Sequence, residues 1–170
     1  MMLFSSLELE SEPRALKWVL SFVRGYLELG MHAAAKRELD RLSVRHRCHP
    51  EIIEMRVRVL LARARYEQAA WLARSASKVY PGIAEFYMLA GEAYETLNRP
   101  EQAKEVWVSA PALFHVSGVF HYNLARYEAL MGNNSTAREH MALAIELDPS
   151  NKERAKSDPR LRDLLSDGTH

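Results

Sequence analysis

Along most of this chain, apolar residues recur at steps of three and four, the spacing that gathers them on one face of an α-helix. The first such stretch predicts a helix over about 14–29. Gly30 interrupts the pattern, and a second helix is expected over about 32–45. The chain is therefore expected to open with two helices joined by a tight turn, the first of which carries an inward stripe of Trp18, Val19, Phe22, Val23 and Tyr26.

The same helix-turn-helix pattern returns every 34 residues. Alanine stands at positions 35, 69, 103 and 137, and no insertion or deletion is needed to divide the chain into units one to four, which cover 16–49, 50–83, 84–117 and 118–151. A hairpin of two helices cannot bury its apolar face alone. The period therefore predicts an all-α solenoid of four stacked units.

Prolines mark the ends of the expected helices. Pro50 fits the first turn of a helix, where its missing N–H is not needed. Pro111 would clash with the carbonyl of Trp107, so the second helix of unit three is expected to end or kink near Ala110. A looser connection over 113–117 should follow.

The three tryptophans have different expected environments. Trp18 and Trp107 lie on inward stripes and are expected in the core. Trp71 follows two alanines and is expected to face either a neighbouring repeat or the exposed convex surface.

Two terminal segments, 1–15 and 152–170, flank the units. Asp158 and Pro159 predict the start of a short helix whose leucines, 161, 164 and 165, cover the last unit. A solenoid needs such a cap because its terminal repeat otherwise exposes an apolar face. The N-terminal segment carries apolar residues that either cap unit one or dock in a second chain: Leu3, Phe4, Leu7 and Leu9.

These positions resemble the tetratricopeptide repeat, whose pattern has a large residue, a leucine–glycine pair and a tyrosine on the first helix, then alanine, an aromatic residue, alanine and proline on the second. The third unit carries the resemblance best, with Tyr87, Gly91, Tyr94, Ala103, Trp107 and Ala110. The fourth follows with Leu124, Gly132, Ala137, Ala144 and Pro149. Arg56 stands where the family usually has leucine and Glu128 where it has tyrosine. Arg47 and His115 stand where it has the closing proline. The run 157–161 also resembles the tail of small bacterial tetratricopeptide proteins.

The resemblance implies a right-handed α-solenoid that binds a protein or peptide partner in a concave groove and has no catalytic activity. In the family, this groove is lined by the second, fifth, ninth and twelfth residues of each first helix. Its expected mixture of arginines and apolar residues favours an amphipathic helix or an extended peptide with carboxylates, although a solvated face with internal ion pairs is the alternative. The residues expected to line it are Lys17, Leu20, Arg24, Leu27, Glu54, Arg58, Leu61, Met88, Glu92, Glu95, Tyr122 and Arg126.

Charge and composition narrow the environment. With 23 basic and 22 acidic residues the formal net charge is +1, which argues against a dedicated nucleic-acid or anionic-membrane surface. No stretch reaches the roughly 18 apolar residues of a membrane span, and the N-terminus lacks the basic region of a secretory signal. A single cysteine, Cys48, suits a reducing compartment, so a cytoplasmic protein is expected.

The sequence contains no recognisable motif of an enzyme or a metal site. Glycine-rich phosphate loops, His-Glu-x-x-His pairs, Cys-x-x-Cys pairs and Gly-x-Ser-x-Gly turns are all missing, so neither catalysis nor a cofactor is expected. His46, Cys48 and His49 supply three potential metal ligands, with a fourth from His115 or His121. Consecutive residues rarely converge on one ion, and a solvated turn between units is the favoured interpretation.

Three functions therefore compete. The leading one is a non-enzymatic scaffold or adaptor. The second is a structural protein that associates with copies of itself through the groove or an uncapped end. The third is an RNA-binding helical repeat, which the balanced charge and the lack of a repeated polar pair make the weakest.

Overall fold

The computed structural model describes residues 5–162 and 164, with side chains from Leu16 onward. Within this part of the chain all regular structure is helical. None of these helices is both long enough and apolar enough to cross a membrane. The helices are α1 (Ser5–Glu28), α2 (His32–Asp40), α3 (Val44–Arg47), α4 (Pro50–Ala62), α5 (Tyr66–Val79), α6 (Ala84–Thr96), α7 (Pro100–Val108), α8 (Ala112–His115), α9 (Gly118–Leu130), α10 (Asn134–Leu147) and α11 (Ser150–Ser157).

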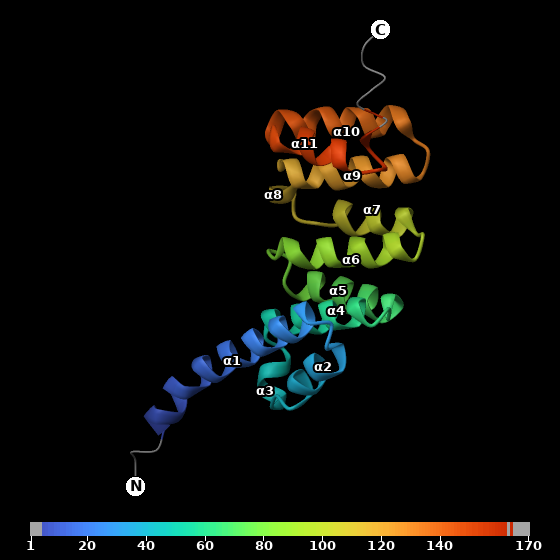
Figure 1. The fold of residues 1–170 in the computed structure, drawn as a ribbon. Coiled ribbons are helices and arrows are strands. Elements are labelled where there is room, and N and C mark those ends of the chain that lie inside the picture. Colours follow the sequence, from blue (N-terminus) through green and yellow to red (C-terminus); the bar gives the residue numbers. More distant parts are fainter. Residues whose placement is uncertain (1–4, 163, 165–170) are drawn as a thin grey trace.

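The longer helices form four pairs that stack into one column, with unit one at the bottom and unit four at the top of Figure 1. We call the first helix of each pair its A helix (α1, α4, α6, α9) and the second its B helix (α2, α5, α7, α10). The B helices of units one to three each pack on the next A helix, α2 on α4, α5 on α6 and α7 on α9. The all-α solenoid predicted from the period is therefore confirmed.

Two residues after the end of each A helix stands a residue in the left-handed conformation, and these residues are spaced like the repeat. They are Gly30 (φ 69°), Ala64 (φ 54°), Asn98 (φ 56°) and Gly132 (φ 80°). In all four turns the next N–H bonds back to the carbonyl five residues earlier. Glycine adopts this conformation freely, whereas it costs alanine roughly 1–2 kcal/mol. The period is thus built into the backbone even where glycine is absent.

The first unit departs from its expected helix bounds at both ends. α1 begins at Ser5 instead of near residue 14, and its N-terminal turns project beyond the column in Figure 1. The four apolar residues of this segment lie outside the described side chains. α2 ends at Asp40 because Ser43 is extended (φ −61°, ψ 158°), and α3 starts after it.

Prolines act at helix ends as expected. Pro50 stands in the first turn of α4, and α7 ends at Val108, before Pro111. The connection that follows contains one helical turn, α8, where the sequence predicted irregular backbone.

The C-terminal segment folds differently from its prediction. α11 was not expected, and helical backbone returns only at Arg162 instead of at Pro159. Leu161 and Leu164 are nevertheless buried in the core of unit four, together with Met141. Leu165 lies outside the described residues.

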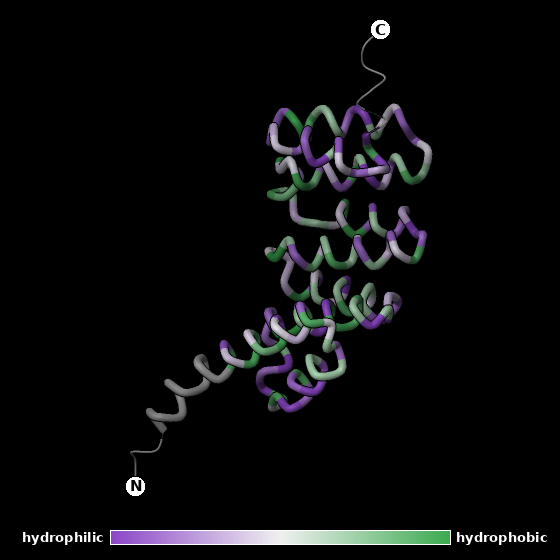
Figure 2. The backbone as a smooth tube through the Cα atoms, viewed as in Figure 1, coloured by the Kyte–Doolittle hydropathy of each residue, from purple (hydrophilic) through white to green (hydrophobic). Residues whose placement is uncertain are grey.

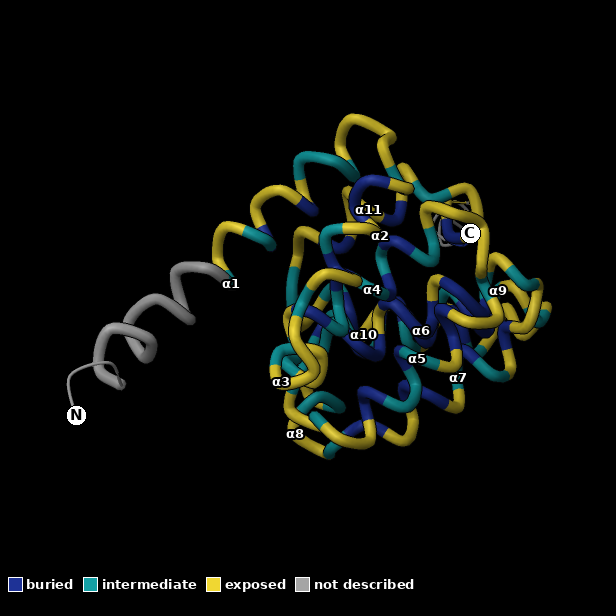
Figure 3. The backbone as a smooth tube through the Cα atoms, turned by 90° about the horizontal axis from the view of Figure 1, so that it is seen from below, coloured by how far each residue is buried: buried dark blue, intermediate teal, exposed yellow. Residues whose placement is uncertain are grey.

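Buried positions run through the centre of the column (Figure 3), while hydrophilic and hydrophobic residues alternate around each helix (Figure 2). Trp107 is 1% exposed and packs 5.9 Å from Tyr87 and 6.2 Å from Phe120, ring centroid to ring centroid, as predicted. A Cβ on Gly91 would overlap the Tyr127 hydroxyl, which explains the glycine of unit three.

The prediction for Trp18 is wrong. Its side chain is 64% exposed, and Phe22, expected on the same inward stripe, is 55% exposed. This face of α1 is the outer end of the described column, so no preceding unit covers it. Trp71 is exposed on α5, one of its two expected environments.

Candidate partner-binding groove

An open cleft of about 690 Å³ lies along the A helices of units one to three. α1, α4 and α6 supply most of its lining. Six residues that the sequence assigned to a groove are gathered there: Arg24, Leu27, Glu54, Arg58, Leu61 and Glu92. We call this cleft the open groove.

Arg58 links two A helices along the open groove. Its Nε donates to the Glu54 carboxylate at 2.9 Å, and a second guanidinium nitrogen pairs with Glu85 of α6. Burial raises the pKa of Glu85, although the charge of Arg58 opposes this rise. Two carboxylates already balance this arginine, so it contributes rigidity between units two and three.

The rest of the open groove offers both apolar and charged surface. Leu27 and Leu61 are partly buried and provide the apolar part. Arg24 lies 4.0 Å from Glu51, and both side chains are about half exposed, which leaves this arginine accessible. Glu92, exposed on α6, adds negative charge at the other side.

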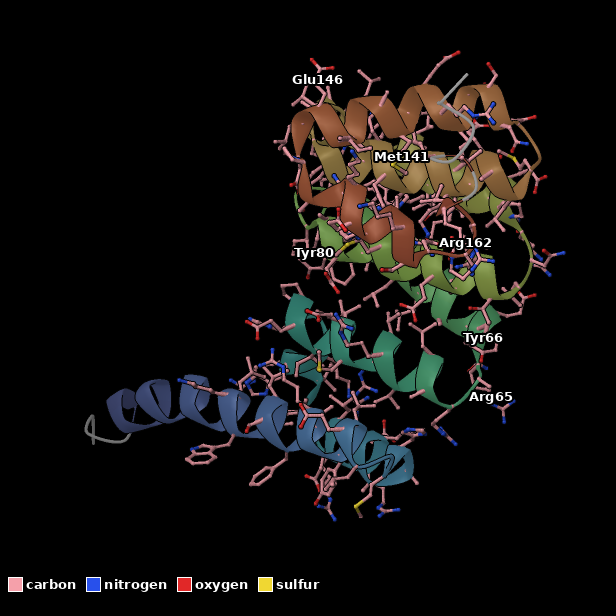
Figure 4. The ribbon with its side chains drawn as sticks, turned by 45° about the horizontal axis from the view of Figure 1, so that its top comes forward. Arg65, Tyr66, Tyr80, Met141, Glu146 and Arg162 are labelled. Atoms are coloured by element: carbon pink, nitrogen blue, oxygen red, sulfur yellow. The ribbon has the colours of Figure 1, made fainter. Side chains whose placement is uncertain are left out.

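Sequence reasoning missed part of this lining. Glu28, Ala62 and Thr96 also line the open groove, and they stand one repeat length apart on α1, at the end of α4 and on α6. The same period that located the other positions would have found them. Tyr66, at the start of α5, lines the groove as well, and Figure 4 shows it beside Arg65 at the α4–α5 turn.

The corresponding surface of units three and four is covered by the chain's own C-terminal segment. Arg126 of α9 pairs with Glu95 of α6 at 2.6 Å and with Asp158 at 3.1 Å. Arg160 lies 3.9 Å from Glu95 and 3.6 Å from Asp158. We call this set of ion pairs the C-terminal latch.

The C-terminal segment buries two residues expected to meet a partner. Tyr122 is 4% exposed, with the guanidinium of Arg154 4.2 Å from its ring centroid. The side chain of Glu95 is nearly inaccessible, and burial raises its pKa against the opposing charges of Arg126 and Arg160. Both residues are therefore structural in this conformation.

The three remaining predicted groove residues lie elsewhere. Leu20 is buried in the core of unit one, because α1 turns that position toward α2 and α4. Lys17 is exposed on α1, and Met88 is partly exposed on α6, but neither lines the open groove.

The histidines form no metal site in the described part of the chain, where no three His, Cys, Asp or Glu residues are placed to share an ion. Cys48 is exposed, and His46 hydrogen bonds to Ser43 at 3.0 Å. His121 meets His140 instead, with 3.1 Å between their Nδ1 atoms. Burial lowers the pKa of both imidazoles, and for His140 the neighbouring His121 lowers it further.

A column of helical hairpins with a groove along its A helices is an α-solenoid. Residues 84–106 and 120–151 match a family model described as tetratricopeptide repeat. These are the units with the strongest sequence pattern. The chain therefore contains tetratricopeptide repeats in units three and four.

Solved structures agree with this assignment at the level of the fold. A thermophilic tetratricopeptide protein of Thermus thermophilus has a TM-score of 0.70 and 21% identity, with 92% of this chain and 84% of that chain covered. MamA from Desulfovibrio magneticus RS-1, residues 41 to the end, has a TM-score of 0.64 and 16% identity, with 92% and 98% covered. No curated protein gave a significant match.

Proposed function

We propose that this protein is a scaffold for protein–protein interaction, which is the general role that the tetratricopeptide fold supports. More specifically, it is a non-enzymatic, cytoplasmic adaptor whose open groove binds a segment of a partner protein. The observation that carries the proposal is the open groove itself. No described residue covers it, whereas the C-terminal segment covers the equivalent surface of units three and four.

The lining selects a partner segment with both apolar and charged residues. Leu27 and Leu61 suit the apolar face of an amphipathic helix or the alternate side chains of an extended peptide. Arg24 is the accessible cation for a partner carboxylate, because Arg58 is already engaged by Glu54 and Glu85. A cation of the partner would meet Glu92.

Rigidity favours binding to this surface. The bridge from Arg58 to Glu85 joins α4 to α6, so the groove is preformed and little ordering of the scaffold opposes association. Affinity would then depend on a few apolar anchors, with the charges selecting the partner and its orientation.

Affinity capture from native cell extract tests the proposal. Wild type is compared with Arg24→Glu and Leu61→Gln, and the captured proteins are identified by mass spectrometry. We expect one or more partners to be lost with both variants, because each removes a different feature of the open groove. Tyr122→Ala is unsuitable, since Tyr122 is buried under Arg154.

Lys78→Glu, a charge reversal on an exposed residue of α5, is the matched control and should retain the partners. Circular dichroism melting curves verify that each variant is folded. Equal recovery with all variants would show that the open groove does not bind the partner, and recovery of this chain alone would favour self-association.

A further inference from the structure

An exposed apolar stripe runs along the outer face of α1. Trp18, Phe22, Gly25 and Leu29 follow at steps of four, three and four, so they share one face of the helix and of its final turn. The three large side chains are 64%, 55% and 74% exposed, and the Trp18 and Phe22 rings stack with centroids 6.3 Å apart. A Cβ on Gly25 would meet no atom within 4 Å. We call these four residues the α1 stripe.

Within the column, the positions equivalent to Trp18 and Phe22 are interface positions. The residues equivalent to Trp18 are Ile52, Phe86 and Phe120, and all three are buried where an A helix follows a B helix. Arg56, equivalent to Phe22, donates to the Leu39 carbonyl of α2 at 2.7 Å. The α1 stripe therefore continues the inter-repeat interface at an end where the described chain has no preceding unit.

The opposite end of the column does not offer α1 a matching surface. Ala155, Leu161 and Leu164 are buried in the core of unit four, beside Met141 of α10. The C-terminal segment thus occupies the place of a fifth A helix, and head-to-tail stacking of copies would require its removal. The stripe needs an occupant from outside the described column.

We propose that two copies of this chain associate through their α1 stripes, antiparallel about a two-fold axis between residues 23 and 24. This register places Trp18 opposite Leu29 of the second copy and Phe22 opposite Gly25 of the second copy. A large side chain meets a smaller one in every layer, and the bare backbone of Gly25 receives the Phe22 ring. The stripe is self-complementary, as a two-fold interface requires.

Charges flanking the stripe agree with this register. Glu28 falls about 3 Å along the axis from Lys17 of the second copy, given the rise of roughly 1.5 Å per residue. Both side chains lie on the same flank of α1 and are exposed. Arg24 lies farther round the helix and is near Glu51 of its own chain. The two-fold symmetry gives two Lys17–Glu28 contacts, one at each end of the interface.

The interface is small, so a weak and reversible dimer follows. Four layers bury less than the roughly 800 Å² per partner of a typical stable interface. We expect a micromolar dissociation constant, with monomers and dimers exchanging.

Sedimentation equilibrium of the full chain over a wide concentration range tests the proposal. Wild type should fit a monomer–dimer equilibrium, and Phe22→Glu should weaken association by about tenfold or more, because it brings a buried charge into each central layer. Gly25→Leu is the sharper test. It fits the monomer and adds apolar surface, yet it fills the site of the Phe22 ring and should also weaken association by about tenfold or more.

The double variant Phe22→Ala with Gly25→Phe exchanges the large and small partners and should restore association. Leu61→Gln in the open groove is the matched control and should leave the dimer unchanged, while melting curves verify folding. A wild type that stays monomeric, a dimer unaffected by Phe22→Glu, or a dimer strengthened by Gly25→Leu would each overturn the proposal. A monomer whose stripe binds a different protein would assign the surface to a partner instead.

Discussion

Arg58 and Arg126 both occupy the ninth position of their A helices, yet they stand in different surroundings. Arg58 lines the open groove, bridges two carboxylates and is 40% exposed in its side chain. Arg126 is 22% exposed and holds Glu95 and Asp158 in the C-terminal latch. The repeat fixes where each arginine points, and the segment that follows unit four decides whether it meets solvent or the chain itself.

The comparison shows that a repeat position is not yet a binding position. Units one to three keep the concave surface free, whereas units three and four use it to attach the cap. One molecule thus combines a surface available for recognition with an equivalent surface used for stability.

The largest expected effect comes from weakening the C-terminal segment that covers units three and four. Leu161→Ala removes a fully buried side chain and should lower the free energy of unfolding by about 2–5 kcal/mol. Leu61→Ala, in the partly exposed open groove, should cost clearly less. Urea denaturation of both variants measures the contrast, and equal losses would show that the C-terminal segment does not stabilise unit four.

Removing each arginine tests the latch more directly. Arg126→Met leaves Glu95 and Asp158 with only the longer contacts of Arg160, at 3.9 and 3.6 Å. It should cost about 2–3 kcal/mol, reduced from the fully buried case by partial exposure and by this remaining cation. Arg58→Met should cost about 1 kcal/mol or less, because that arginine is more exposed. Urea denaturation measures both losses, and the reverse order would contradict the assigned roles.

A smaller effect depends on pH and is localised in unit four. Burial lowers the pKa of His121 and His140 below the ordinary 6.5, so the unfolded chain binds protons more readily than the folded chain. Stability from this pair should be present above pH 6.5 and lost as the pH falls below it.

Urea denaturation at several pH values, with wild type beside His140→Gln, measures the slope. The groups facing the pair are His115 of α8, Lys104 of α7, Glu128 of α9 and Glu139 of α10. The variant should show a shallower fall in stability between neutral and mildly acid pH. If the free energy of unfolding depends on pH equally in both proteins, the histidine pair is not the source of the pH dependence.

Much of the architecture could be predicted because the period reports packing directly. The alanines at 35, 69, 103 and 137 are all fully buried, which follows from the close approach of two helices at each of these positions. Half of the predicted groove residues line the open groove for the same reason: equivalent positions on stacked A helices face the same side.

The errors arise where the repeat ends. Trp18 occupies the same position in its repeat as the buried Phe86. Burial at this position requires a preceding unit, and the periodicity does not show whether one is present. The covering of Tyr122 and Glu95 depends on α11 and the residues after it, which follow no repeat. Local pattern predicts which face a residue occupies, whereas the neighbouring element determines what that face meets.

Gly91 and Tyr127 illustrate how the repeat constrains its own evolution. The hydroxyl of Tyr127 occupies the space that a methyl group at position 91 would need. The effect of a substitution at either site therefore depends on the residue at the other, although the two belong to different units and lie 36 positions apart. In descendants of this sequence the two sites should vary as a pair, with a side chain gained at 91 only where the aromatic ring at 127 has first been replaced by a smaller residue.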